Sequence, residues 1–270
     1  MEGMSLTDSK HIKPKAVSAL STGELEGKTA LVTGGGGVIG PAYARALAEA
    51  GAAVALVDID AGKAQRAAKK LCDDGFKVQG WQADVGVKAD IEAAVSDAQN
   101  VLGGIDILIN NAGYATTMDF EDISEAEFDK VLNANLKGAF FVSQVCVPHM
   151  KEKGWGRIVN LTSTVSKIGP GDLPHYVATK TGVIGLTRSL ARALGKHGIT
   201  VNALAPGMVA TEPIIALYPE SALDNHAARR SIKRWEYAED LVGPLTYYCS
   251  KHADFVTGQT MLVDGGQQFD

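Results

Sequence analysis

The sequence predicts a single α/β domain, a doubly wound parallel sheet of about seven strands with helices on both faces. The chain has 270 residues, of which 46% are hydrophobic and 21% charged, enough for one domain with a large core. From Lys28 onward, short apolar runs rich in β-branched residues alternate with amphipathic stretches. Strands that are apolar at nearly every position are typical of parallel sheets buried on both faces.

The predicted strands follow one another with room for a helix between most of them. The first two, 29–33 and 53–57, flank a helix predicted from Pro41 to Ala50, where a proline near the helix start loses no hydrogen bond. The remaining strands are expected at 78–83, 105–109, 158–161, 200–204 and 260–264. No repeat or linker divides the chain, so residues 25–270 are expected to form one domain behind a flexible N-terminal tail of residues 1–24.

Composition excludes several classes of function. The formal net charge of −5 offers no basic excess for a nucleic acid or a membrane surface. The three cysteines, Cys72, Cys146 and Cys249, are odd in number and form no Cys-x-x-Cys pair, so neither a disulfide framework nor a metal site is expected. Free thiols indicate a cytoplasmic protein. No apolar stretch reaches the ~18 residues of a membrane span. For residues 1–24, a tail, an alternative start and a transit peptide remain open.

The first predicted strand runs into the glycine-rich stretch Thr33-Gly-Gly-Gly-Gly-Val-Ile-Gly40. Gly35, Gly37 and Gly40 satisfy the pattern Gly-x-Gly-x-x-Gly between a strand and a helix. Such a turn lets the backbone approach a pyrophosphate closely, at the positive end of the helix dipole. The pattern therefore predicts a Rossmann-like dinucleotide site, whereas a glycine-rich turn alone would be only a turn.

Asp58 ends the second predicted strand, eighteen residues beyond Gly40 by sequence count. A carboxylate there can accept hydrogen bonds from both adenosine ribose hydroxyls and would repel a 2′-phosphate. No Arg or Lys stands in the glycine turn or directly after Asp58, so NAD is favoured over NADP. Asp84-Val85 is a candidate for adenine contact, and Asn110-Asn-Ala-Gly113 for close passage along the cofactor. Ordinary turn chemistry is the alternative for both.

Three polar residues have the spacing of an acid–base site. Tyr176 and Lys180 stand one helical turn apart, so their side chains share a face of the predicted helix. Ser163 ends an apolar run that predicts a buried strand, and the carboxyl ends of such strands carry the chemistry of α/β sheets. A neighbouring cation favours phenolate, so this group can move a proton on and off an alcohol.

In these motifs the chain resembles the short-chain dehydrogenase/reductase family over residues 27–267. The resemblance rests on several motifs in the family's order: Thr33-Gly34…Gly40, Asp84, Asn110-Asn-Ala-Gly113, Asn135, Ser163, Tyr176-x-x-x-Lys180, Pro206-Gly207 and Val263-Asp-Gly-Gly266. It implies that Tyr176 is the general acid/base and that Lys180 lowers the tyrosine pKa and binds the nicotinamide ribose. Ser163 would orient the substrate oxygen, and Asn135 would hold a water that links Lys180 to solvent.

The motifs and the resemblance together give the expected cofactor-binding residues: Gly34, Gly37, Val38, Ile39, Gly40, Asp58, Ile59, Asp84, Val85, Asn111, Ala112, Gly113, Tyr176, Lys180, Pro206, Gly207, Val209 and Thr211. One departure is Val38, which stands where the family usually has a second glycine. Gly37 precedes it and keeps the dinucleotide spacing, so the departure puts the geometry of the turn in doubt but does not remove the site.

Several further polar residues lie near these motifs and have expected positions outside the catalytic set. The resemblance implies a mobile lid over residues 212–233, in which Arg229, Arg230 and Lys233 are candidates for binding a carboxylate or phosphate; a solvated helix face is the alternative. His175 is expected to line or shield the pocket from a loop. Arg234 matches a structural arginine of the family.

The sequence thus predicts an NAD-dependent oxidoreductase that interconverts a secondary alcohol and a ketone. Polar residues between Ser163 and Tyr176 favour a small polar substrate such as a sugar, polyol or hydroxy acid. A non-catalytic NAD-binding sensor or scaffold is the alternative, as is a lyase or dehalogenase on the same fold. Gly182, Gly185 and Ser189 share one helix face, and the family pairs subunits through this helix, so a homotetramer is expected.

Overall fold

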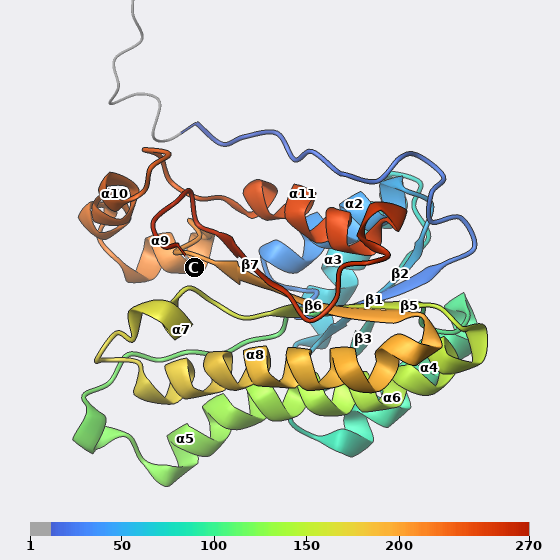
Figure 1. The fold of residues 1–270 in the computed structure, drawn as a ribbon, viewed down its shortest axis with the longest axis horizontal. Helices are drawn as coiled ribbons and strands as arrows, with labels where there is room; N and C mark the ends of the chain where they lie inside the picture. Colours follow the sequence, from blue (N-terminus) through green and yellow to red (C-terminus); the bar gives the residue numbers. More distant parts are fainter. Residues whose placement is uncertain (1–11, 270) are drawn as a thin grey trace, which may run out of the picture.

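Seven parallel strands form the central sheet of the computed structural model, in the order β3-β2-β1-β4-β5-β6-β7. The structure describes residues 12–269. The strands are β1 (Thr29–Thr33), β2 (Ala53–Asp58), β3 (Val78–Gln82), β4 (Ile107–Asn110), β5 (Gly156–Leu161), β6 (Ile199–Pro206) and β7 (Thr260–Val263). The predicted doubly wound sheet is confirmed (Figure 1).

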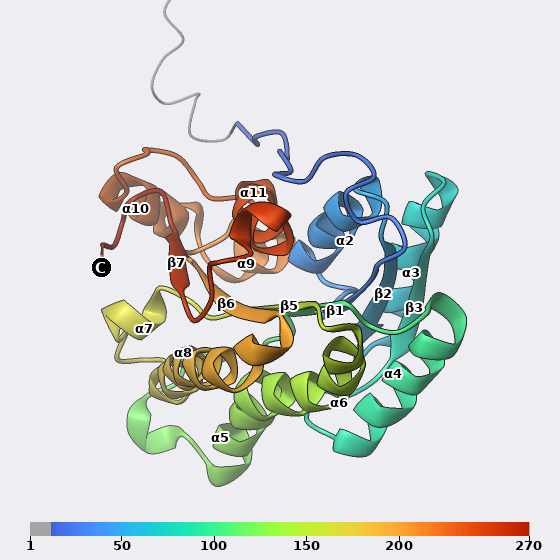
Figure 2. The ribbon, with the colours of Figure 1, turned by 45° about the vertical axis from the view of Figure 1, so that its right-hand side comes forward.

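Helices cover both faces of this sheet. They are α2 (Ile39–Glu49), α3 (Ala61–Asp73), α4 (Lys88–Leu102), α5 (Glu125–Leu132), α6 (Gly138–Lys153), α7 (Val165–Ile168), α8 (Pro174–Leu194), α9 (Glu212–Leu217), α10 (Glu220–Arg229) and α11 (Ala238–Cys249). One buried apolar cluster joins α2, α3 and α11 to the sheet, and a second joins α4, α6 and α8 to the opposite face (Figure 2). The core therefore consists of two layers, as nearly all-apolar strands require.

The strand order reverses direction between β1 and β4. After β3 the chain crosses to the other side of β1 and continues outward through β4, β5, β6 and β7. In open α/β sheets the crevice at such a reversal, beyond the carboxyl ends of the strands, is where ligands bind. The motifs identified in the sequence follow these carboxyl ends.

Most element boundaries differ from the sequence-based expectation by one or two residues. Helix α2 begins at Ile39, two residues before the expected Pro41, which still lies in the first turn where no N–H is needed. Strand β4 begins at Ile107 and not at residue 105. Asp106 bonds to the neighbouring strand β1 twice: its backbone N–H donates to the Thr29 oxygen at 2.9 Å, and its carboxylate accepts the backbone N–H of Thr29 at 2.9 Å.

Part of the expected N-terminal tail is packed against the domain. Leu20 of this tail, like Leu25 at the start of the predicted domain, is buried in the cluster that contains α2 and α11. The backbone N–H of Ala19 donates to Thr246 Oγ1 in α11 at 2.8 Å, and Lys13 forms an ion pair with Glu239. Residues 1–11 of the predicted tail lie outside the described residues. Within residues 12–269, no helix is both long and apolar enough to cross a membrane.

Candidate active site

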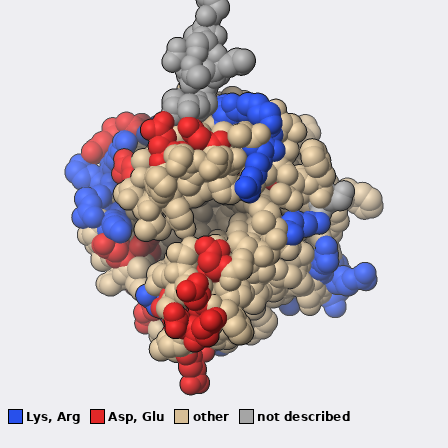
Figure 3. Space-filling view, turned by 90° about the vertical axis from the view of Figure 1, so that its left-hand side faces the viewer, with Lys and Arg blue, Asp and Glu red and all other residues tan. Residues whose placement is uncertain are grey.

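The predicted site residues gather at the carboxyl edge of the sheet. This edge lies at the left of Figure 1, where α9 and α10 stand on one side and α7 and the first turn of α8 on the other. Figure 3 looks onto the same edge and shows a hollow at its centre, with acidic side chains gathered below it. The hollow is the candidate substrate cleft.

The glycine-rich turn between β1 and α2 leads into a helix N-terminus that no side chain of the described residues caps. Gly34 has φ +64°, and a Cβ on Gly40 would lie 2.5 Å from the Gly34 oxygen, so both positions require glycine. No side chain caps the N-terminus of α2, and its first turn contains no acidic residue. Val38, with φ −93°, is an ordinary right-handed residue, so the departure from glycine introduces no backbone strain. The turn fits a pyrophosphate.

Asp58 and Ile59 follow β2 beside this turn. The Asp58 carboxylate accepts the backbone N–H groups of Gly36 at 2.9 Å and Asp60 at 3.0 Å, which fixes its position next to the glycines. Ile59 is 65% exposed, so an apolar surface is open beside the carboxylate. Lys63 of α3 was not anticipated: a Cβ on Gly36 would lie 2.5 Å from the Lys63 Cβ. The sequence could have indicated that Lys63 lies near the glycine turn, because it stands five residues beyond Asp58 in the first turn of the next helix.

Of the predicted residues after β3 and β4, those after β4 hold the glycine turn and those after β3 make other contacts. Asn111 Nδ2 donates to the Thr33 oxygen at 2.9 Å and the Gly34 oxygen at 3.3 Å, so the end of β4 holds the glycine turn. The Asp84 carboxylate accepts the backbone N–H of Gly86 at 2.8 Å and therefore stabilises the turn after β3. Val85 is buried and packs against Gly138, so its side chain belongs to the core.

The buried side chains of Lys180 and Asn135 lie beside Gly113, which is itself exposed. A Cβ on Gly113 would be 3.0 Å from Asn135 Oδ1 and 3.6 Å from Lys180 Nζ. Lys180 Nζ donates to the Leu161 carbonyl at 2.8 Å, and Asn135 Nδ2 donates to the Tyr114 carbonyl at 2.7 Å. Asn135 is held in a π-helical turn (Asn133–Lys137) between α5 and α6, an irregularity frequent at functional sites.

Ser163 and Tyr176 meet where β5 ends and α8 begins. Thr164 N donates to the Pro206 oxygen at 2.9 Å, and Ser163 Oγ lies 3.5 Å from the same oxygen, so the ends of β5 and β6 are joined there. Burial raises the pKa of Tyr176 to about 12, and a hydrogen bond with Ser163 partly opposes this rise. Burial lowers the pKa of Lys180 to about 8. The pKa of Tyr176 lies above its ordinary value in these residues, because loss of hydration outweighs the hydrogen bond with Ser163. The lowering of this pKa by Lys180 stays a prediction.

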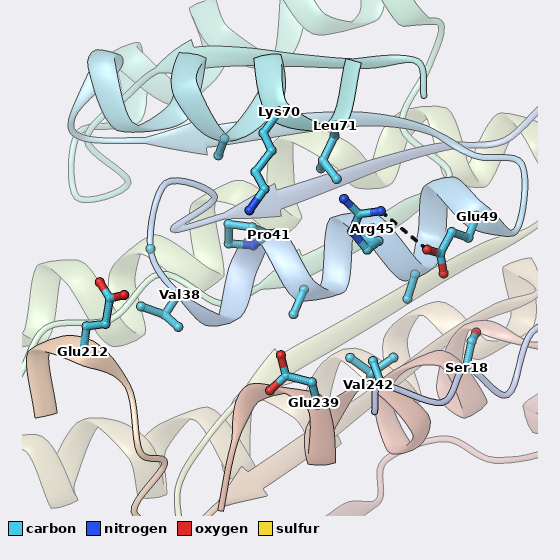
Figure 4. A pocket seen from close by; sticks show the side chains of 15 residues that line it. Ser18, Val38, Pro41, Arg45, Glu49, Lys70, Leu71, Glu212, Glu239 and Val242 are labelled. Carbon is cyan, nitrogen blue, oxygen red and sulfur yellow. Dashed lines mark ion pairs between the residues drawn. The ribbon is translucent and has the colours of Figure 1, made fainter. Parts of the chain in front are cut away.

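A second depression, of 480 Å³, begins at the glycine turn and runs along α2 (Figure 4). It lies between α2, α3 and α11 and includes Gly37 and Val38, while Arg45 and Lys70 point toward it. Ser163, Tyr176 and Lys180 do not line this groove. It is therefore distinct from the candidate substrate cleft.

Two secondary expectations require correction. His175 is not in a loop: it is the second residue of α8, is 2% exposed, and lies 3.4 Å by Nε2 from Thr116 Oγ1. Arg230 does not offer a free guanidinium to a substrate, because it is 2% exposed and paired with Glu236. Arg234 pairs with Asp240, in keeping with a structural role. Glu236 was missed, since an isolated glutamate gives no sign in the sequence that it will be buried.

Comparison with known proteins agrees with this geometry. A model of the short chain dehydrogenase family matches residues 28–220. The chain belongs to the short-chain dehydrogenase/reductase family. Members of this family are oxidoreductases that use a nicotinamide cofactor, and the free donors at the start of α2 and the carboxylate of Asp58 fit such a group.

The similar proteins act on different alcohols and ketones. A 5-keto-D-gluconate 5-reductase from Escherichia coli is 35% identical over 90% of this chain and 96% of its own. A (2S)-[(R)-hydroxy(phenyl)methyl]succinyl-CoA dehydrogenase subunit from Thauera aromatica is 38% identical over 90% and 97%. A crystal structure of a gluconate 5-dehydrogenase from Burkholderia cenocepacia, bound to NADP and tartrate, superposes with a TM-score of 0.86 at 36% identity, covering 90% of this chain and 96% of that one.

Proposed function

We propose that this protein interconverts a secondary alcohol and a ketone with a nicotinamide cofactor, and that Tyr176 is its general acid/base. The observation that carries the proposal is the meeting of Tyr176, Ser163 and Lys180 at the end of β5, together with a glycine turn that leads into the uncapped N-terminus of α2. Fold alone would not justify a catalytic assignment, because the same fold serves many functions.

The residues supply positioning and a proton, and when bound the cofactor supplies or accepts the hydride. In ketone reduction the protonated Tyr176 hydroxyl donates its proton to the substrate oxygen, while the Ser163 hydroxyl holds that oxygen in place. In alcohol oxidation the tyrosine oxygen takes the proton. In this proposal Lys180 favours the anionic form of the phenol, and Asn135 links Lys180 to solvent. The nearness of both side chains to Gly113 supports this link.

We propose a small polyhydroxylated substrate, with sugar acids such as 5-keto-D-gluconate as the first compounds to test. Support comes from the names of two similar proteins, the ketogluconate reductase and the gluconate dehydrogenase. The test is a panel of sugar acids, polyols and 3-oxoacyl thioesters, followed by absorbance of the reduced nicotinamide. If only the 3-oxoacyl thioesters were turned over, the substrate would be an acyl thioester and not a sugar acid or polyol. Cofactor binding without turnover of any compound would indicate a non-catalytic binding protein.

We also propose that NAD is the preferred cofactor. The Asp58 carboxylate stands beside the glycine turn, where it would repel a 2′-phosphate. The NADP bound by the gluconate 5-dehydrogenase and the nearness of Lys63 make this preference a direct experimental question. A cytoplasmic location is proposed as well, supported by three free cysteines, of which Cys146 and Cys249 are buried.

A further inference from the structure

A buried ion pair lies outside the catalytic set, at the base of the segment formed by α9 and α10. Arg230 directly follows α10, and Glu236 lies just before α11. Arg230 Nη2 is 2.9 Å from Glu236 Oε2, and the two residues are 2% and 4% exposed. Burial raises the pKa of Glu236, and Arg230 opposes the rise. Because burying two charges costs much of what their attraction contributes, stability alone explains such a pair poorly.

Both members of the pair also hold the backbone that follows β6. Arg230 Nη2 donates to the Met208 carbonyl at 2.9 Å. The Glu236 side chain accepts the N–H of Gly207 at 3.2 Å, and its backbone carbonyl accepts the N–H of Ala210 at 2.7 Å. Three backbone groups of the segment Gly207–Ala210 are therefore fixed by two residues that lie more than twenty positions further along the chain.

The contact is too close to tolerate a side chain at Gly207. A Cβ there would lie 2.7 Å from Glu236 Oε2 and 3.2 Å from Arg230 Nη2. The residue before it, Pro206, reaches the other side of the segment, where its oxygen accepts the Thr164 N–H and lies 3.5 Å from Ser163 Oγ. The ion pair and the candidate catalytic serine thus face each other across one stretch of backbone.

The same contacts join the two ends of the α9–α10 segment. Met208 precedes α9, and Arg230 follows α10. The hydrogen bond between them therefore joins the two ends of the α9–α10 segment. Arg230 Nη1 also donates to the Arg234 carbonyl at 2.9 Å, which fixes the returning chain. Movement of α9 and α10 over the cleft would therefore pivot on this pair.

We propose that Arg230 and Glu236 are positioning residues that hold Gly207–Ala210 against Ser163 and close the base of the α9–α10 segment. The kinetic consequence rests on the function proposed above, whereas the structural consequence does not. A displacement of about 1 Å in a positioning element can reduce a rate on the order of a hundredfold. The pair thereby acts on the site without touching the substrate.

The test compares Arg230→Met with Arg234→Met. Both variants break an ion pair of the same returning segment, but the Arg234 guanidinium bonds to Asp240 and to the Trp235 carbonyl and not to Gly207–Ala210. Amide hydrogen exchange is measured in the cofactor-free protein. Arg230→Met is expected to accelerate exchange of peptide 206–211 on the order of tenfold and to lower kcat more than it changes the substrate KM. Arg234→Met is expected to lower Tm without either effect.

A double variant, Arg230→Met/Glu236→Met, separates positioning from stability. Replacing a buried pair by apolar side chains removes the unpaired charge, so Tm is expected to recover. Exchange of peptide 206–211 is expected to stay fast, because the Gly207 N–H keeps only its longer bond, 3.4 Å to the Val263 oxygen, and the Met208 carbonyl lacks its partner. Recovery of exchange and kcat together with Tm would overturn the proposal, as would unchanged exchange in Arg230→Met. If Arg230→Met fails to fold, the double variant alone decides. Absence of turnover in the unmodified protein would refute the proposed function. The hydrogen-exchange result would still test whether Arg230 and Glu236 hold Gly207–Ala210 in place.

Discussion

Lys180 donates a hydrogen bond from its ammonium to the carbonyl oxygen of Leu161 at 2.8 Å. The backbone carbonyl of the same lysine accepts a hydrogen bond from Thr162 Oγ1 at 2.7 Å. These two contacts join the second turn of α8 to the end of β5. The ammonium is satisfied by a neutral carbonyl, and its burial lowers its pKa to about 8. Lys180 therefore reduces the stability of the fold while it serves the candidate site.

Lys180→Met is expected to lose activity and to gain thermal stability at pH 7, because it removes both the proposed catalytic charge and the cost of burying it. Folded Lys180 releases its proton near pH 8, whereas the unfolded chain retains it up to the ordinary pKa of 10.5. Between these values the unfolded state holds more protons, so the stability of the unmodified protein rises with pH, by about 3 kcal/mol in all. Thermal denaturation of both proteins between pH 7 and pH 10 should show the advantage of the variant shrinking. A variant less stable at pH 7 would contradict this.

Asp58→Ala is expected to weaken NAD binding and to narrow the preference over NADP. Each lost hydrogen bond to a charged acceptor contributes roughly 1.5–3 kcal/mol, and removal of the charge also removes the repulsion of a 2′-phosphate. Fluorescence titration with the two reduced cofactors measures both effects. Asp60→Ala is the control, because Asp60 caps α3 through the Lys63 N–H and lies beside the same turn. Equal or tighter binding of NADP by the unmodified protein would refute the preference.

The protein is expected to be a homotetramer that uses the outer face of α8. Gly185 is exposed, and an added Cβ there would meet nothing within 4 Å, so its small size has no explanation inside the subunit. Gly182 differs, since a Cβ would lie 2.9 Å from Leu136. Gly185→Arg should therefore reduce the mass measured by light scattering, whereas Gly182→Ala should affect stability and leave the assembly intact. A monomeric mass for the unmodified protein at micromolar concentration would contradict the prediction.

The sheet and the order of its motifs were predictable because they depend on local patterns. Nearly all-apolar strands identify a parallel sheet buried on both faces, and the residues that follow each strand share one edge of it. What failed depends on contacts distant in sequence. Asp106, just before β4, bonds to Thr29 through its carboxylate as well as its backbone, and Thr246 Oγ1 of α11 accepts the backbone N–H of Ala19 in the expected tail.

The candidate site shows the same division. The spacing of Tyr176 and Lys180 on one helical face is a local feature, and the sequence predicted it. Their pKa values could not be predicted in this way, because burial is the largest influence on both. Burial depends on how completely the surrounding elements exclude water, which no motif records. Likewise, Arg230 suggested an anion site because a basic residue is usually exposed, and only the fold reveals that Glu236 occupies it.

Tyr176→Phe is the decisive test of the proposed mechanism, since it retains the ring and removes only the atom that carries the proton. General acid–base catalysis contributes ~10²–10⁴-fold, so kcat should fall by at least that order while the reduced cofactor still binds. Tyr114→Phe is the matched control: Tyr114 lies beside Asn135, but its hydroxyl bonds to Glu127 and Lys130, so this variant should keep most of its activity.

The pH dependence of the unmodified protein tests the same residue independently. Burial raises the pKa of Tyr176 to about 12, so the phenol holds its proton at neutral pH and is ready for ketone reduction. Oxidation needs the phenolate, so its rate should rise as the pH increases from 7 toward 10, and the rise should vanish in Tyr176→Phe. Near-normal turnover by a folded Tyr176→Phe protein, or an unchanged rise with pH, would show that another group carries the proton.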